Sequence, residues 1–148
     1  MEKKVDLKEA YSKIKAPVII ATKNPKNGQY DLTPYGWVMP YDYDPVTKVV
    51  LSSDPQHQAD VNIRQTGEFA VLIPAEPDGK LVTETGSVSG AAVDKFEKFK
   101  IPAHKAQKTD LLIPDEGICC VIECSLVKVQ AEGSVDLIFG QSVAAYEL

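Results

Sequence analysis

Two short runs of unusual residues, 34–37 and 54–57, lie close together in the sequence between segments that have the composition of β-strands. The region 27–69, which contains both runs, also holds the only Trp, the only Arg (Arg64) and one of the two His residues. Aromatic faces and polar groups gathered at strand ends and on a short helix suit a flat, phosphorylated cofactor. This region is therefore the first candidate for a functional site.

The second run has the pattern of an anion site. Ser52 and Ser53 end an expected strand, a helix is expected to begin directly after them, and His57 lies in its first turn. The free N–H groups and the positive end of a helix dipole attract a phosphate. His57 could equally be a plain surface residue, and Arg64 fits better as a partner of the helix dipole or of a local acid than as a ligand contact.

The elements that must position these residues are mainly strands. Apolar runs bounded by turn residues predict strands at residues 18–22, 30–39, 48–52, 68–73, 118–130, 135–139 and 141–146. Asn27-Gly28 is a strong reversal signal between the first two. Seven strands interrupted by short helices favour a closed β-barrel over a sandwich or a parallel sheet. We expect one domain over residues 1–148.

Helical signals are few. Residues 6–14 have helical spacing of apolar side chains and predict an N-terminal helix that packs on the barrel. A second helix is expected from Asp54, an N-cap followed by Pro55, to about residue 65, with Gly67 as a left-handed cap. Ala92, Phe96 and Phe99 predict a small helix. Residues 74–90 are expected to be loop with one brief helix or strand, and 101–114 are expected to be irregular.

Composition limits the function classes. The 148 residues carry 16 basic and 21 acidic side chains and a net charge of −5, which argues against nucleic acid as a partner. No apolar run approaches the ~20 residues that span a bilayer, and residues 1–7 lack the pattern of a secretory signal, so we expect no membrane association and a cytoplasmic location.

The three cysteines do not have the spacing of metal ligands. Cys119, Cys120 and Cys124 lie in one expected buried strand, where neighbouring side chains point to opposite faces. Cys120 and Cys124 share a face but are separated by ~13 Å. We therefore expect reduced thiols that pack as small apolar side chains, and no metal site.

An ordered set of short motifs resembles the flavin reductase-like, FMN-binding split-barrel family, which includes flavoredoxins. The set consists of residues 17–22, 27–28, 34–37, 44–45, 62–63, 67–71, 94–96 and 122–124, and the resemblance covers roughly residues 15–140. It implies a split β-barrel with short covering helices, FMN near the interface of a homodimer, and electrons that arrive from a nicotinamide (NADH or NADPH) or a protein donor.

The resemblance also implies a flavin site. Backbone groups from Tyr35 to Val38 would line the pyrimidine edge of the ring, with Gly36 allowing close approach and Trp37 offering a stacking face. The alternatives are a strand with a bulge at Tyr35 and Gly36, and a core aromatic at Trp37.

Three further positions are assigned by the same resemblance. Asn62 matches a family motif position, and Lys95 matches a position near the flavin or its phosphate, where a cation would hold an anionic reduced flavin. Lys95 could instead be a solvated lysine. Relatives commonly carry a hydroxyl three residues before the position of Asn62, and here that residue is Ala59.

Two function classes follow from the sequence. The first is a flavin-dependent oxidoreductase that passes electrons through bound FMN to free flavin, to a redox protein or to a small acceptor. The second is a non-catalytic FMN carrier or sensor, or a dimeric barrel that binds a partner without a cofactor. Ala59 and the end of the chain at Leu148 favour the second class. No nucleophile elbow, Rossmann glycine motif or zinc-hydrolase motif is found.

Overall fold

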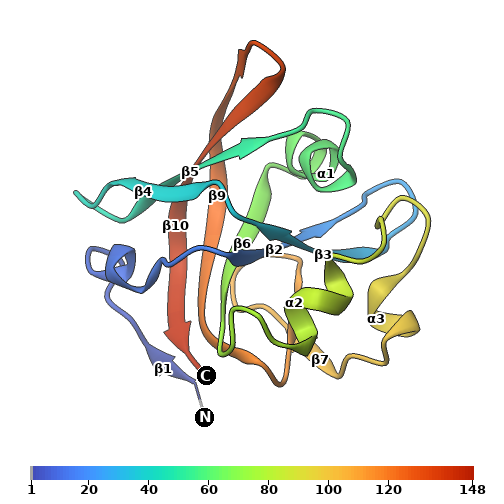
Figure 1. Ribbon diagram of the computed structural model, residues 1–148. Coiled ribbons are helices and arrows are strands. Elements are labelled where there is room, and N and C mark those ends of the chain that lie inside the picture. The colour runs from blue at the N-terminus through green and yellow to red at the C-terminus, as the bar shows by residue number, and fades with distance from the viewer. Residues whose placement is uncertain (1) are drawn as a thin grey trace.

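The computed structural model describes residues 2–148 and is built around one strongly curved, antiparallel sheet (Figure 1). Seven strands follow the order β3-β2-β6-β9-β10-β5-β4, and β1 pairs with the end of β10. Their bounds are β1 Lys3–Lys4, β2 Val18–Lys23, β3 Tyr30–Tyr35, β4 Val38–Asp42, β5 Lys48–Ser53, β6 Glu68–Pro74, β9 Ile118–Glu132 and β10 Val135–Glu147. A separate hairpin consists of β7 Ala103–Lys105 and β8 Leu112–Pro114.

The two strands at the ends of this order, β3 and β4, are consecutive in the chain. Only Gly36 and Trp37 separate them, so the sheet must curve until its two ends come close. β9 and β10 form a long hairpin whose tip extends beyond the other strands (Figure 1). The mainly β architecture with short helices that the sequence predicts is confirmed.

Because side chains along a strand point alternately to the two faces of the sheet, apolar side chains pack on both faces. On β2, Val18 and Ile20 point into the larger core with Phe69 and Ile122, whereas Ile19 points to the other face. That second face is covered by α2 (Lys80–Thr85), α3 (Lys95–Lys98) and the β7–β8 hairpin. Each fully buried aliphatic side chain contributes roughly 1.5–3 kcal/mol, so β2 is fixed from both sides.

Two strand predictions were wrong in their bounds. The expected strand over residues 30–39 is divided at Gly36 and Trp37 into β3 and β4, which lie at opposite ends of the sheet order. Conversely, the expected strands 135–139 and 141–146 form the single strand β10, whose pairing with β9 shifts register between Phe139 and Gly140. A Cβ at Gly140 would lie 2.5 Å from the Phe69 ring, so glycine is needed there for packing rather than for a turn.

The helix predictions were right in place and wrong in extent. The N-terminal helix is a single 3-10 turn, Ala10–Lys13, although Leu7 and Ile14 do pack on the core. α1 begins at Gln58 and not at Asp54, because Asp54 forms a tight turn in which its side chain accepts a hydrogen bond from the N–H of Gln56. The predicted cap at Gly67 is confirmed, with φ of 75°.

The remaining segments are more ordered than expected. Residues 74–90 contain the short helix α2, and residues 101–114 contain the β7–β8 hairpin. The small helix expected around Phe96 is one turn, α3, which Asp94 caps by accepting a hydrogen bond from the N–H of Glu97.

The cysteine strand agrees with its prediction in large part. Cys120 and Cys124 are buried thiols in β9, and burial raises the pKa of Cys120 to about 11. Cys119 points to the opposite face and is exposed.

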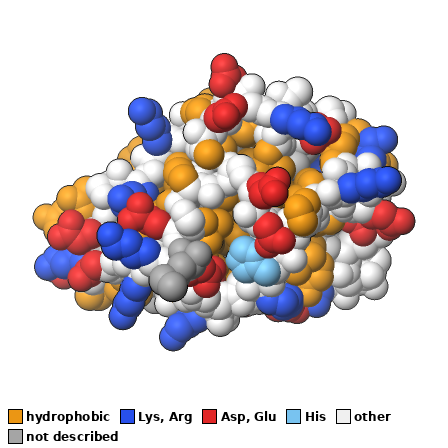
Figure 2. Space-filling model, turned by 90° about the horizontal axis from the view of Figure 1, so that it is seen from below, with side chains coloured by type: hydrophobic (Ala, Val, Ile, Leu, Met, Phe, Trp, Pro, Cys, Tyr) orange, Lys and Arg blue, Asp and Glu red, His pale blue; other side chains and the backbone are white. Residues whose placement is uncertain are grey.

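Charges of both signs are interspersed on the face of the molecule that Figure 2 shows. Within residues 2–148, no helix has the length and apolar character needed to cross a membrane.

Candidate functional site

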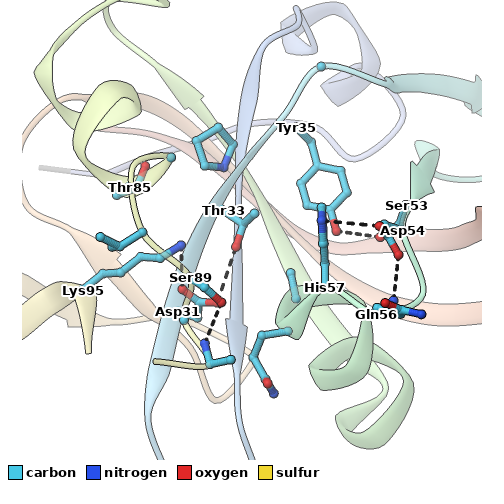
Figure 3. Close-up of a pocket in the computed structure, with 18 of the residues that line it drawn as sticks. Asp31, Thr33, Tyr35, Ser53, Asp54, Gln56, His57, Thr85, Ser89 and Lys95 are labelled. Atoms are coloured by element: carbon cyan, nitrogen blue, oxygen red, sulfur yellow. Dashed lines mark hydrogen bonds and ion pairs between the residues drawn. The ribbon is translucent and has the colours of Figure 1, made fainter. Parts of the chain in front are cut away.

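A cavity with a volume of about 780 Å³ opens where β3 ends, β5 ends and α1 begins. Residues 85–91, which are the last residue of α2 and the segment after it, form the facing wall. Figure 3 shows polar side chains from these four places around one space. The volume falls within the range of about 300–1,000 Å³ that is usual for cofactor sites.

Tyr35 forms the base of one wall and is fixed by a hydrogen bond. Its hydroxyl lies 2.8 Å from the Ser53 hydroxyl, and both residues are buried (Figure 3). Burial, together with the negative charges of Asp60 and Asp31, raises the pKa of Tyr35 to about 12. The phenol is therefore neutral at physiological pH and holds the end of β3 against the end of β5.

Gly36 and Trp37 form an open edge of the same cavity. Trp37 is 71% exposed, so the alternative of a core aromatic is wrong for this residue. A Cβ at Gly36 would meet no heavy atom within 4 Å, which leaves space for a ligand to approach the backbone. An exposed indole beside an open backbone edge is suited to stacking a flat ring.

The turn between β5 and α1 brings the second predicted run to the cavity. Ser52, Ser53 and His57 all line it, and His57 is the N-cap of α1. The His57 side chain makes no capping hydrogen bond; its Nε2 lies 3.6 Å from Asp54 Oδ2. The His57 side chain therefore does not cap α1, whose first residues Gln58 and Ala59 line the cavity.

Lys95 lies in the cavity wall and is only 2% exposed, so the alternative of a solvated lysine is wrong. Its Nζ donates to the carbonyl oxygen of Leu32 at 2.5 Å and lies 3.1 Å from Asp31 Oδ1. Gly90 packs against the same carboxylate, because a Cβ there would lie 2.1 Å from Asp31 Oδ2. The Asp31–Lys95 pair therefore joins β3 to α3, which follows the wall formed by residues 85–91.

Two of the predicted site residues do not line the cavity. Asn62 is fully buried in α1, where its amide donates to Thr22 Oγ1 and accepts from Gln58 Nε2. The side chain of Val38 packs against the main core. In this structure Asn62 positions α1 on β2.

Sequence reasoning missed a group of hydroxyl and amide residues in the cavity. The lining also contains Thr33, Gln56, Gln58, Thr85, Ser87 and Ser89. The density of Ser, Thr and Gly in residues 83–90 was the one available signal, because such segments are usual at ligand sites as well as in plain loops. Nothing local in the sequence shows that this segment lies beside β3.

Arg64 pairs with local acids, as expected. Its Nε lies 2.6 Å from Asp60 Oδ1 and 3.7 Å from Asp136 Oδ2, behind the wall that Ala59 and Val135 form. Burial and the adjacent Asp60 carboxylate raise the pKa of Asp136. A cluster of two acids and one arginine thus ties α1 to the start of β10.

Comparison with known proteins gives two curated relatives at low identity. The Escherichia coli K12 protein YddH is 26% identical over 129 residues, which are 86% of this chain and 68% of YddH. A protein of Archaeoglobus fulgidus is 28% identical over 106 residues, which are 71% of this chain and 58% of that protein.

Solved structures share the fold. An FMN-binding domain of a flavin reductases-like enzyme from Shewanella baltica superimposes with a TM-score of 0.83, at 19% identity, over 99% of this chain and 77% of that one. The FMN-binding protein from Thermus thermophilus has a TM-score of 0.76, at 24% identity, over 88% and 69%. The flavoredoxin from Methanosarcina acetivorans has a TM-score of 0.77, at 22% identity, over 89% and 68%.

The family model described as "Flavin reductase like domain" matches residues 11–147. That match includes every strand of the curved sheet except β1, and all four cavity walls. The chain belongs to the flavin reductase-like domain family.

Proposed function

We propose that this protein binds FMN in the cavity at the β3–β4 junction and transfers electrons through it as a flavin-dependent oxidoreductase. One observation carries the proposal. The residues expected from the sequence to contact a flavin line a single cavity, with the exceptions of Val38 and Asn62. Membership of the flavin reductase-like family supports the same ligand.

The lining fits the parts of FMN. The open edge at Gly36 and the exposed Trp37 suit the isoalloxazine ring, and the hydroxyl-rich wall from Thr85 to Ser89 suits the ribityl chain. The turn before α1, with Ser52 and His57, is nearest to a helix N-terminus, so the phosphate end of FMN would lie there. Bound flavin would supply the redox chemistry, and this chain's residues would bind and orient it.

The proposal includes a homodimer whose interface lies beside this cavity. β4 is an edge strand, and its residues Met39 and Tyr41 are 56% and 38% exposed, next to Trp37, which is 71% exposed. Strand register places Met39, Val50 and Phe139 in one row across three strands, opposite to the core row. An exposed apolar row that continues into a ligand cavity is typical of an interaction surface, and a second copy of the chain is the partner that the family resemblance implies.

The donor in this proposal is NADH, NADPH or a redox protein, and the acceptor is free flavin, a protein or a small molecule. A non-catalytic flavin carrier or sensor is the second candidate. The observation that favours it is Ala59, a buried methyl in the cavity wall at the position where relatives commonly carry a hydroxyl. Loss of that hydrogen bond would weaken the hold on the flavin without affecting the fold.

Thermal unfolding with added FMN tests binding, and rapid reduction tests catalysis. At 100 times its dissociation constant, a ligand stabilises by ~2.7 kcal/mol, which is a rise of roughly 5–10 °C in Tm for a domain of this size. Reduction of the bound flavin by NADH or NADPH in stopped-flow absorbance then separates the oxidoreductase from the carrier. An unchanged Tm at saturating FMN would contradict both and leave a cofactor-free binding module.

A further inference from the structure

Among residues 2–148, two basic side chains line the cavity, Lys95 and His57. Each of them lies within 4 Å of a carboxylate. Lys95 Nζ lies 3.1 Å from Asp31 Oδ1 and also donates to the Leu32 carbonyl, with the ion pair almost out of solvent. His57 Nε2 lies 3.6 Å from Asp54 Oδ2. A lysine already neutralised by a buried carboxylate offers a phosphate little additional attraction, because moving it would leave Asp31 unpaired.

The carboxylates directly behind the wall that Ala59 and Val135 form also disfavour a phosphate in the cavity. Asp60 is fully buried next to Ala59, and Asp136 follows Val135 and pairs in register with Ser53. The one nearby arginine, Arg64, is committed to Asp60 at 2.6 Å and to the Pro55 carbonyl at 2.9 Å. Three carboxylates, Asp54, Asp60 and Asp136, thus lie at or behind the phosphate end of the cavity, and the permanent cation beside them, Arg64, is already paired.

The same walls suit an uncharged polyol. Six serine and threonine residues line the cavity: Thr33, Ser52, Ser53, Thr85, Ser87 and Ser89. Gln56 and Gln58 add amide groups. Hydroxyls and amides both donate and accept, and a carboxylate such as Asp54 accepts from a ribityl hydroxyl but repels a phosphate.

We propose that the cavity holds a flavin by its ring and ribityl chain and gains little from the phosphate, so that riboflavin is bound about as tightly as FMN. This proposal rests on the proposed flavin site. It extends the ligand class of the protein to unphosphorylated flavins and identifies Asp54 as a residue that sets this preference, because Asp54 is the exposed carboxylate closest to the helix start.

Calorimetric titration of the flavin-free protein with riboflavin and with FMN tests the proposal, at 50 mM and at 500 mM NaCl. We expect the two dissociation constants to differ less than tenfold and the FMN constant to change less than threefold with salt, because no unpaired cation is there to be screened. FMN binding at least tenfold tighter than riboflavin would overturn this proposal while supporting the flavin site. If neither flavin binds, both proposals fail.

A charge-neutralising variant gives a second, independent readout. Asp54→Asn keeps the oxygen that accepts from the N–H of Gln56 and removes the negative charge. We expect it to tighten FMN binding at least threefold and to leave riboflavin binding within twofold. Asp42→Asn is the matched control, since Asp42 also accepts N–H bonds within a turn, from Tyr43 and Asp44, but lies outside the cavity lining. Equal effects of Asp54→Asn on both flavins would contradict a role for this charge.

Discussion

Asp31 and Lys95 form an ion pair at 3.1 Å in which the side chains are 6% and 2% exposed. The two residues are far apart in the sequence, and their contact attaches α3 and the preceding loop to β3. Within residues 2–148, Asp31 is the one acidic residue that pairs with Lys95 within 4 Å. The Asp31–Lys95 pair therefore helps to hold the cavity wall from Thr85 to Lys95 against β3, together with the Lys95–Leu32 hydrogen bond and the packing of Gly90.

Breaking that pair should be costly. Asp31→Asn leaves the Lys95 ammonium buried without its counter-charge, and we expect a loss of about 3–5 kcal/mol in the free energy of unfolding. Urea denaturation followed by circular dichroism measures it. Asp44→Asn is the control, because its pair with Lys8 is exposed and spans 3.9 Å, so the change there should be far smaller. A loss below 1 kcal/mol for Asp31→Asn would show that the pair does not hold the wall.

Two glycines of the cavity should respond differently to alanine. Gly90→Ala brings a methyl into the Asp31 carboxylate and should cost about 1–3 kcal/mol of stability. Gly36→Ala meets open space, so its stability should stay within about 0.5 kcal/mol, while its affinity for FMN falls because the methyl occupies the ring edge. Denaturation and flavin titration of both variants check this pattern. If Gly36→Ala bound FMN as tightly as the unmodified protein, this result would contradict the placement of the flavin ring at the Gly36 edge.

Glu123 should make the free energy of unfolding depend on pH in the acidic range. Its buried carboxylate accepts from the N–H groups of Gln107, Lys108 and Thr109 and from the Tyr146 hydroxyl. Burial alone would raise the pKa of Glu123, but these hydrogen bonds outweigh it and lower the pKa below 4.5. The folded state thus favours the ionised form, and its stabilisation is full above pH 4.5 and is lost as the pH falls below that value.

Glu123→Gln tests this contribution. At pH 7 it should cost about 2 kcal/mol or more, because the amide cannot accept all of these bonds, and the difference from the unmodified protein should shrink below pH 4.5. Glu132→Gln, exposed on the same strand, is the control. A difference that stays constant from pH 7 to pH 3 would contradict the assignment.

The proposed dimer depends on the apolar row of β4. Met39→Glu places a charge at its centre, and we expect the mass measured by light scattering to fall from that of two chains to that of one. Thr83→Glu, an exposed change of equal charge on α2, should leave the mass unchanged. A monomeric unmodified protein would contradict the dimer directly.

Local signals explain what could be predicted from the sequence. The left-handed cap at Gly67, the buried Cys120 and Cys124 and the β2–β3 reversal each depend on a few neighbouring residues. The sequence prediction divides β10 into two strands, 135–139 and 141–146, on either side of Gly140. Gly140 is instead required by the close approach of the Phe69 ring, a contact between distant segments.

About half of the residues that line the cavity could be predicted from the sequence. Residues 35–37 and 52–57 carry unusual side chains at strand ends, which is why they could be found. The wall of Thr85, Ser87 and Ser89 could not be found, because its position depends on the Asp31–Lys95 pair and on Gly90. Asn62 matched a family motif, but in this chain its amide is used for packing α1 on β2 through Thr22.

The single tryptophan permits the most direct test of flavin binding. Trp37 is the only Trp of the chain, lines the cavity and is 71% exposed. Titration with FMN or riboflavin should quench the fluorescence of Trp37 saturably. In Gly36→Ala, higher flavin concentrations should be needed for the same quenching. Quenching that is linear and equal to that of free N-acetyltryptophanamide, with no saturation, would contradict the flavin site.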